Sequence, residues 1–215
     1  MIDKYDSICV KILDLISAKF NIFVYDKNEV LFGNYEFTRI ISSGISKFEG
    51  EKIYIDTASV DNHKIVSSNY VISHLSRPSR ANMQPIINST WLAKLKDSPK
   101  FMMINDYSKH EIDNLIFSTG FLGLKSSNRY INSYLYTLIS SKYFQERKNQ
   151  VSVGATMQSV NNDVFNDISV PDVEEDESIQ FGESVDEMYK HIYFVRKKIE
   201  NLKIIKSIFL EMFFS

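Results

Sequence analysis

The chain has 215 residues, of which 44% are hydrophobic, and its formal net charge at pH 7 is −2. This composition excludes a disordered or fibrous chain and a uniformly basic nucleic-acid coat, and the length suits one domain of ordinary size. A single cysteine, Cys9, excludes a disulfide framework and a zinc site built on paired cysteines. The first residues are acidic before they are apolar, which does not fit a secretory signal peptide. No apolar run reaches the ~18 residues of a membrane span. We therefore expect a cytoplasmic protein with no membrane contact.

Hydrophobic periodicity predicts the elements in chain order. Residues 3–20 predict a helix, and the runs 22–25 and 30–32 predict a hairpin around the turn 26–28. Strands are expected at 52–56, 70–75, 91–95, 101–104, 115–117 and 121–124, and an amphipathic helix is expected at 133–148. Because strands and helices do not alternate regularly, the predicted fold class is α+β. It consists of a globular domain of short strands and a few helices, followed by a long C-terminal coiled-coil helix.

The last segment differs in kind from the rest. No glycine or proline occurs from Ser184 to Phe214, and apolar residues recur at spacings of three and four, which is a heptad pattern. The candidate seam consists of Met188, Ile192, Val195, Ile199, Leu202, Ile205, Phe209 and Met212. A helix of roughly 45 Å is longer than a small domain covers, which favours an arm that pairs with a partner helix. The alternatives are a helix packed on the local core and pairing with the N-terminal helix of the same chain.

Charge is strongly segregated along the chain. Residues 51–150 carry 13 basic and 8 acidic side chains, whereas residues 151–190 carry one basic and 10 acidic side chains. The acidic block follows Pro171 and is typical of a solvated linker. The basic middle is a candidate nucleic-acid surface, because Arg and Lys neutralise phosphates and Arg, Asn and Gln read base edges. Its candidate DNA-binding residues are Arg77, Arg80, Asn82, Gln84, Asn88, Lys94, Lys96, Lys100, Lys125 and Arg129.

Within this set, Arg77 and Arg80 form the preferred pair, because Pro78 between them stiffens the segment that presents both. Signals for catalysis are absent from the sequence. The four histidines have no ligand-spaced partners, and no phosphate-binding glycine loop or nucleophile elbow occurs. We expect no catalytic residue, no metal and no cofactor in this chain.

Five short motifs occur in a fixed order. They are Tyr54-Ile55-Asp56-Thr57-Ala58-Ser59-Val60, Arg77-Pro78-Ser79-Arg80-Ala81-Asn82-Met83, Phe117-Ser118-Thr119-Gly120-Phe121, Gly154-Ala155-Thr156-Met157-Gln158-Ser159-Val160-Asn161 and Ile168-Ser169-Val170-Pro171. A terminal helix follows them. In this order the motifs resemble one target-recognition domain plus one spacer helix of the specificity (S) subunit of type I restriction-modification systems.

The resemblance implies a DNA-reading subunit without catalysis of its own. Two recognition domains of such a subunit read the two halves of a split DNA site, and two antiparallel spacer helices set the gap. The helices dock methyltransferase (M) subunits, which carry S-adenosylmethionine, and restriction-translocase (R) subunits join that core. With one recognition domain and one helix, this chain is expected to act as a half-subunit, as a homodimer or paired with another half.

The expected division of the chain has four parts. Residues 1–34 form an N-terminal helix and hairpin of unknown role, 35–170 the recognition domain that binds double-stranded DNA, 171–182 an acidic linker and 183–215 the spacer and dimerisation helix. The competing interpretation is a coiled-coil adaptor that binds protein and no DNA.

Overall fold

Helices and short strands are mixed along the chain, which confirms the α+β prediction. The computed structural model describes residues 2–153 and 158–214. The helices are α1 (Ile2–Phe23), η1 (Phe32–Asn34), α2 (Lys109–Asn114), α3 (Arg129–Ser140), α4 (Lys142–Val151), α5 (Asn162–Asn166) and α6 (Glu175–Phe214). The strands are β1 (Glu29–Leu31), β2 (Thr38–Ile40), β3 (Glu51–Ile55), β4 (Val60–Asp61), β5 (Lys64–Ile65), β6 (Val71–Ser73), β7 (Ala81–Met83), β8 (Ser89–Ala93), β9 (Phe101–Ile104), β10 (Leu115–Ser118), β11 (Phe121–Ser126) and β12 (Ser169–Pro171).

Among the described residues, two four-stranded sheets form the centre of the domain. Their strand orders are β2-β11-β8-β9 and β6-β3-β10-β7. All pairs are antiparallel except β3 with β10, in which Ile53 lies opposite Leu115. The six strand ranges predicted between residues 52 and 124 all coincide with strands, to within a few residues at their ends.

The sheet that contains β8 and β11 separates two apolar cores. Successive side chains of a strand point to opposite faces, so Leu92 packs toward the helices and Trp91 packs toward the other sheet. Gly123 on β11 accommodates the fully buried Trp91 indole, because a Cβ at this position would lie 2.6 Å from the ring. Helix α3 closes the helical side and is capped by Asn128, whose side chain accepts hydrogen bonds from the Tyr130 and Ile131 amides.

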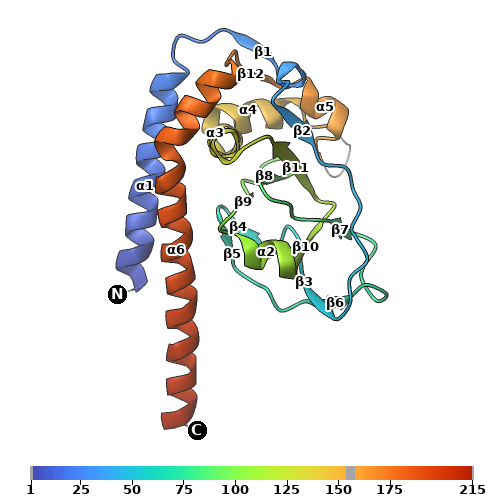
Figure 1. Ribbon diagram of the computed structural model, residues 1–215, viewed down its shortest axis with the longest axis vertical. Helices are drawn as coiled ribbons and strands as arrows, with labels where there is room; N and C mark the ends of the chain where they lie inside the picture. The colour runs from blue at the N-terminus through green and yellow to red at the C-terminus, as the bar shows by residue number, and fades with distance from the viewer. Residues whose placement is uncertain (1, 154–157, 215) are drawn as a thin grey trace.

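Helix α1 runs antiparallel to the first half of α6, and α3 packs against α6 from the domain side (Figure 1). The Phe23 and Phe181 rings join α1 to α6 at 4.8 Å between centroids, and Lys198 lies 5.1 Å from the Tyr5 ring near the other end of α1. Burial of this aromatic cluster extends α1 through Phe23, so the predicted hairpin over 22–32 is wrong. Strand β1 instead pairs with β12, with Val30 opposite Val170.

Two further predicted boundaries differ from the structure. The helix predicted at 133–148 is two helices that meet at Ser141, which caps α4 by accepting a hydrogen bond from the Phe144 amide. The acidic segment predicted as a linker at 171–182 is helical from Glu175 onward. Acidic side chains in the first turn stabilise a helix because they interact with the positive end of its dipole. The buried Phe181 also packs against the core, which a solvated linker would not do.

The candidate seam divides at about residue 200. Ile192, Val195 and Ile199 are buried in the chain's own core with α1 and α3, so this part of the seam is not free for a second chain. Beyond Ile199 the helix extends past the start of α1 (Figure 1). We call residues 200–214 the free arm, and its length is about 22 Å. Among the described residues, no helix is long and apolar enough to cross a membrane.

Candidate nucleic-acid interface

The turn between β10 and β11 is the point at which three of the predicted motifs meet. The Thr119 amide donates to the Arg80 carbonyl at 2.9 Å. A Cβ on Gly120 would lie 3.2 Å from the Arg80 guanidinium and 3.2 Å from the Thr57 methyl group. Segments that are distant in the sequence therefore place Thr57, Arg80 and Gly120 in contact.

The segment after β8 extends the same site. The Lys94 amide donates to the Gly120 carbonyl at 2.9 Å, and the Lys96 amide donates to the Gln158 carbonyl at 2.8 Å. The Lys96 ammonium also donates to Gln158 Oε1 at 2.8 Å. We call Thr57, Arg80, Lys94, Lys96, Gly120 and Gln158 the turn cluster. Residues 154–157 of the fourth motif lie outside the described residues.

The turn cluster suits an anionic partner. Arg80 is exposed, and burial lowers the pKa of the Lys94 ammonium. Lysine and arginine side chains at the edge of a domain are the groups that contact backbone phosphates. Within the described residues no group of three or more His, Cys, Asp or Glu side chains is arranged to hold a metal ion.

Asn82 and Gln84 lie on one side of the segment through β7. They flank the buried Met83, and both are partly exposed. Arg77 lies in the loop before β7, where its guanidinium donates to the His74 carbonyl at 2.5 Å. Arg77 therefore contacts the start of its loop, just after β6, whereas Arg80 belongs to the turn cluster. The two arginines that the sequence predicted as a pair lie in different surroundings.

Lys125 lies at the far end of β11 and forms a second basic position. Its ammonium donates to the Ile87 carbonyl at 2.6 Å, and Arg39 stands directly opposite on β2. Burial, and secondly the Arg39 charge, lower the pKa of Lys125. Like charges directly opposite each other destabilise a sheet pair, and an anion would relieve this repulsion. The sequence reasoning missed Arg39, because the three-residue strand β2 is too short to show an alternating pattern.

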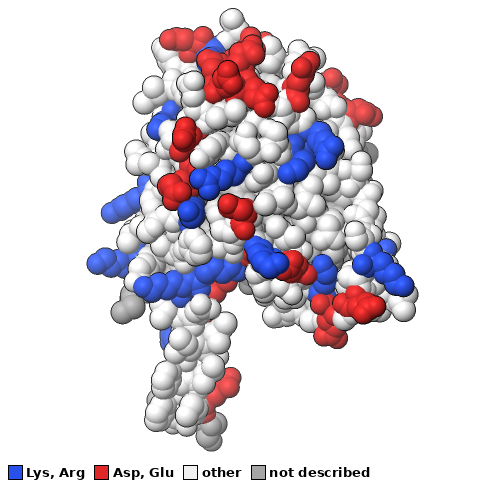
Figure 2. Space-filling model, viewed as in Figure 1, with Lys and Arg blue, Asp and Glu red and all other residues white. Residues whose placement is uncertain are grey.

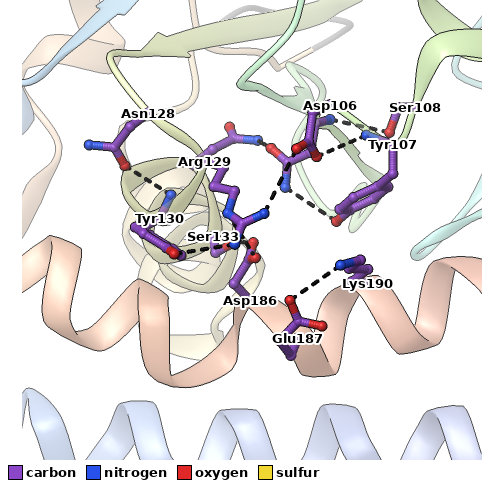
Figure 3. Close-up of polar contacts among 12 residues, drawn as sticks. Asp106, Tyr107, Ser108, Asn128, Arg129, Tyr130, Ser133, Asp186, Glu187 and Lys190 are labelled. Carbon is purple, nitrogen blue, oxygen red and sulfur yellow. Dashed lines mark hydrogen bonds and ion pairs between the residues drawn. The ribbon is translucent and has the colours of Figure 1, made fainter.

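Arg129 lies apart from the turn cluster, at the junction between α3 and α6 (Figure 3). Its Nε lies 3.4 Å from Asp186 Oδ2, and its Nη1 lies 3.8 Å from Asp106 Oδ2. Ser133 donates to the other Asp186 oxygen at 2.9 Å. Burial raises the pKa of Asp186, while Ser133 and Arg129 act in the opposite direction. This arrangement ties the domain to α6, so Arg129 has a structural role here that the sequence did not indicate.

Charge is distributed unevenly over the molecule. Figure 2 shows acidic side chains gathered at the end where α6 begins and basic side chains farther down, toward the level at which the free arm leaves the domain. The free arm carries seven large apolar side chains that are exposed within one chain. The residues of the arm that carry this apolar surface are Ile204, Ile205, Ile208, Phe209, Leu210, Met212 and Phe213.

Leu202 is partly exposed, and Met188 is partly buried beside the chain's own core. Of the eight candidate seam residues, Ile205, Phe209 and Met212 are therefore the ones with large exposed side chains in a single chain.

Comparison with known proteins gives a match at the level of fold. No family model matches the chain, and no curated protein matches it. Solved structures do match, and those described below belong to type I restriction-modification systems, two of them named as S subunits. The chain thus has the fold of this class of subunit, which confirms the resemblance noted in the sequence.

Three solved chains illustrate the match. A structure described as the basis of complex assembly and conformational transition of the type I R-M system is 18% identical, with a TM-score of 0.52, covering 82% of this chain and 48% of that one. The HsdS subunit from Thermoanaerobacter tengcongensis is 17% identical, with a TM-score of 0.51, covering 83% and 48%. The type I S subunit from M. genitalium is 17% identical, with a TM-score of 0.50, covering 96% and 52%. The chain spans about half the length of the structures that it matches.

Proposed function

We propose that this chain is the DNA-recognition subunit of a type I restriction-modification system and acts as a half-subunit without catalysis of its own. The observation that carries the proposal is the turn cluster, in which backbone hydrogen bonds tie the segments of Arg80 and Lys94 to the β10–β11 turn and Lys96 to Gln158, within a domain that has the fold of specificity subunits. Lysines and arginines placed in this way neutralise duplex phosphates, and neighbouring Asn82 and Gln84 are suited to base edges.

The proposed partners are those that the resemblance to specificity subunits implies. The half-subunit binds double-stranded DNA, docks a methyltransferase subunit that carries S-adenosylmethionine, and joins a restriction-translocase subunit in the cytoplasm. It pairs with a second copy or with another half-subunit. Because Ile192, Val195 and Ile199 are already buried against α1 and α3, we assign the pairing to the free arm, where Phe209 and Met212 are 54% and 70% exposed.

A two-fold pair joined through the arms would place identical recognition domains at opposite ends of the dimer. The expected target is then an interrupted palindrome with a constant spacer. The decisive experiment maps methylated bases in DNA exposed to this chain together with its methyltransferase. A bipartite motif supports the proposal, whereas no site-specific methylation with an active methyltransferase contradicts it.

Duplex binding by the chain itself gives a simpler test. The affinity should fall steeply with salt, and Arg80→Gln should weaken binding by about 10-fold and reduce the salt slope by about one. The control is Lys142→Gln, which removes one positive charge from the start of α4, outside the turn cluster.

The exposed apolar arm also favours a second candidate, a protein-binding adaptor. A chain that pairs through its arm but shows no salt-dependent duplex binding, alone or with a methyltransferase, would support the adaptor instead.

A further inference from the structure

Lys148, in the last turn of α4, is buried without a carboxylate partner. Its side chain is fully buried, and its ammonium donates to the Leu95 carbonyl at 3.0 Å and to the Ala93 carbonyl at 3.3 Å. Within the described residues it makes no ion pair. Lysine is almost never fully buried unless it is paired, and an unpaired buried charge lowers stability. Stability alone therefore does not explain why a lysine occupies this buried position.

The two carbonyls that Lys148 holds stand on either side of Lys94. The next residue of α4 holds the other end of the same turn, because the Asp97 amide donates to Asn149 Oδ1 at 3.0 Å and Asn149 Nδ2 donates to Asp97 Oδ1 at 2.8 Å. Asp97 has a φ of +54°, a left-handed conformation that is uncommon outside glycine and that aspartate adopts more often than most residues. The end of α4 thus determines the shape of the turn from Ala93 to Asp97.

This turn carries two of the cations of the turn cluster, Lys94 and Lys96. We propose that Lys148 and Asn149 are positioning residues for DNA binding, which hold the Ala93–Asp97 turn in the shape that presents Lys94 and Lys96 to a backbone phosphate. The inference rests on the proposed function and adds to it residues that lie behind the binding surface. It also accounts for the buried charge, which adds to the positive potential beneath the turn.

The charge state of Lys148 gives the inference a pH dependence. Burial lowers the pKa of Lys148 to about 8, while Asp97 acts in the opposite direction. The other charged groups of the turn are Lys94 and Lys96. A bound phosphate favours the charged form of Lys148, so duplex affinity should decrease as pH rises through about 8 and this ammonium loses its proton.

The experiment compares duplex affinity of the full chain, by fluorescence anisotropy at several salt concentrations and from pH 6.5 to 9. Lys148→Met should weaken binding by about 10-fold and reduce the salt slope, and it should remove the decrease near pH 8. Asn149→Ala should weaken binding several-fold and leave the pH profile as in the wild type. The matched control is Lys142→Met, the same change at the exposed start of the same helix, which should bind as the wild type does.

The outcomes separate this inference from the function on which it rests. A wild-type chain with no salt-dependent duplex binding overturns the proposed function. If the wild type binds but both Lys148→Met and Asn149→Ala match the control in affinity, salt slope and pH profile, the positioning role is overturned. Circular dichroism establishes whether each variant folds. If Lys148→Met does not fold, the affinity of Asn149→Ala tests the positioning role by itself, and an affinity equal to that of the control overturns it.

Discussion

Replacement of Gly182 by alanine tests how the recognition domain is seated on α6. Gly182 lies in the second turn of this helix, where α6 crosses the first turn of α3. A Cβ at this position would lie 3.0 Å from Tyr130 Cα and closer still to the Tyr130 carbonyl carbon and oxygen. All three atoms belong to backbone, so no side-chain rotation relieves the clash and the two helices must separate.

The cost can be estimated from overpacking in cores, which is typically 1–3 kcal/mol. Because neither the added Cβ nor the Tyr130 backbone can rotate away from this contact, we expect Gly182→Ala to lose about 3 kcal/mol of unfolding free energy. For a chain of this size the loss corresponds to a decrease in Tm of roughly 6–12 °C. Separation of α3 from α6 should also disturb the neighbouring contact of Arg129 with Asp186.

Thermal and urea unfolding followed by circular dichroism measure this effect. Gly33→Ala is the matched control, because its Cβ would meet the Asn166 side chain at 3.3 Å, a contact that small shifts can relieve. The control should change Tm by only a few degrees. If Gly182→Ala unfolds at the same temperature and urea midpoint as the wild type, the close crossing of α3 and α6 is refuted.

Four further predictions follow from single contacts. Phe209→Asp should leave Tm nearly unchanged, because the side chain is exposed in one chain, but should abolish pairing in sedimentation velocity; an unchanged sedimentation coefficient would contradict the assignment to the arm. Arg129→Gln should cost about 1–2 kcal/mol in urea unfolding, because it leaves the buried Asp186 carboxylate with fewer partners, and an unchanged midpoint would argue against the pair. The pKa of Lys148 is about 8 in the folded chain, and its ordinary value is 10.5. Between these pH values the unfolded chain binds more protons than the folded chain, so the stability of the wild type relative to Lys148→Met should rise by up to about 3 kcal/mol over this pH range. A stability difference that does not change with pH would count against the buried charge. Burial raises the pKa of the Cys9 thiol, so thiol reagents should modify it only as the chain unfolds, and rapid labelling of the native protein would show that α1 is not packed as described.

The sequence predicted the strands well where their apolar side chains form short runs of their own. The ranges around β8, β9 and β11 are examples, since apolar residues dominate each one. It failed where a distant segment decides the conformation. The run at 22–25 has β-forming residues, but packing of Phe23 on Phe181 makes it the end of a helix.

The candidate site was predictable only as a set of residue types. The motifs contained Arg80, and the basic middle contained Lys94 and Lys96, but nothing in the sequence placed these residues together. Their contacts run through backbone hydrogen bonds between loops, such as Lys94 to Gly120. Lys148 was missed because a lysine in an amphipathic helix is expected to face solvent, whereas the carbonyls of Ala93 and Leu95 hold it inside.

By itself, then, the sequence determined the α+β class, the long terminal helix and the order of the motifs, because these depend on local periodicity and on residue type. The tertiary structure decided which part of the seam is free and which cations meet. Periodicity identifies the apolar face of a helix but not what covers it, and here α1 and α3 cover α6 as far as Ile199. The free arm and the turn cluster emerge only from that packing.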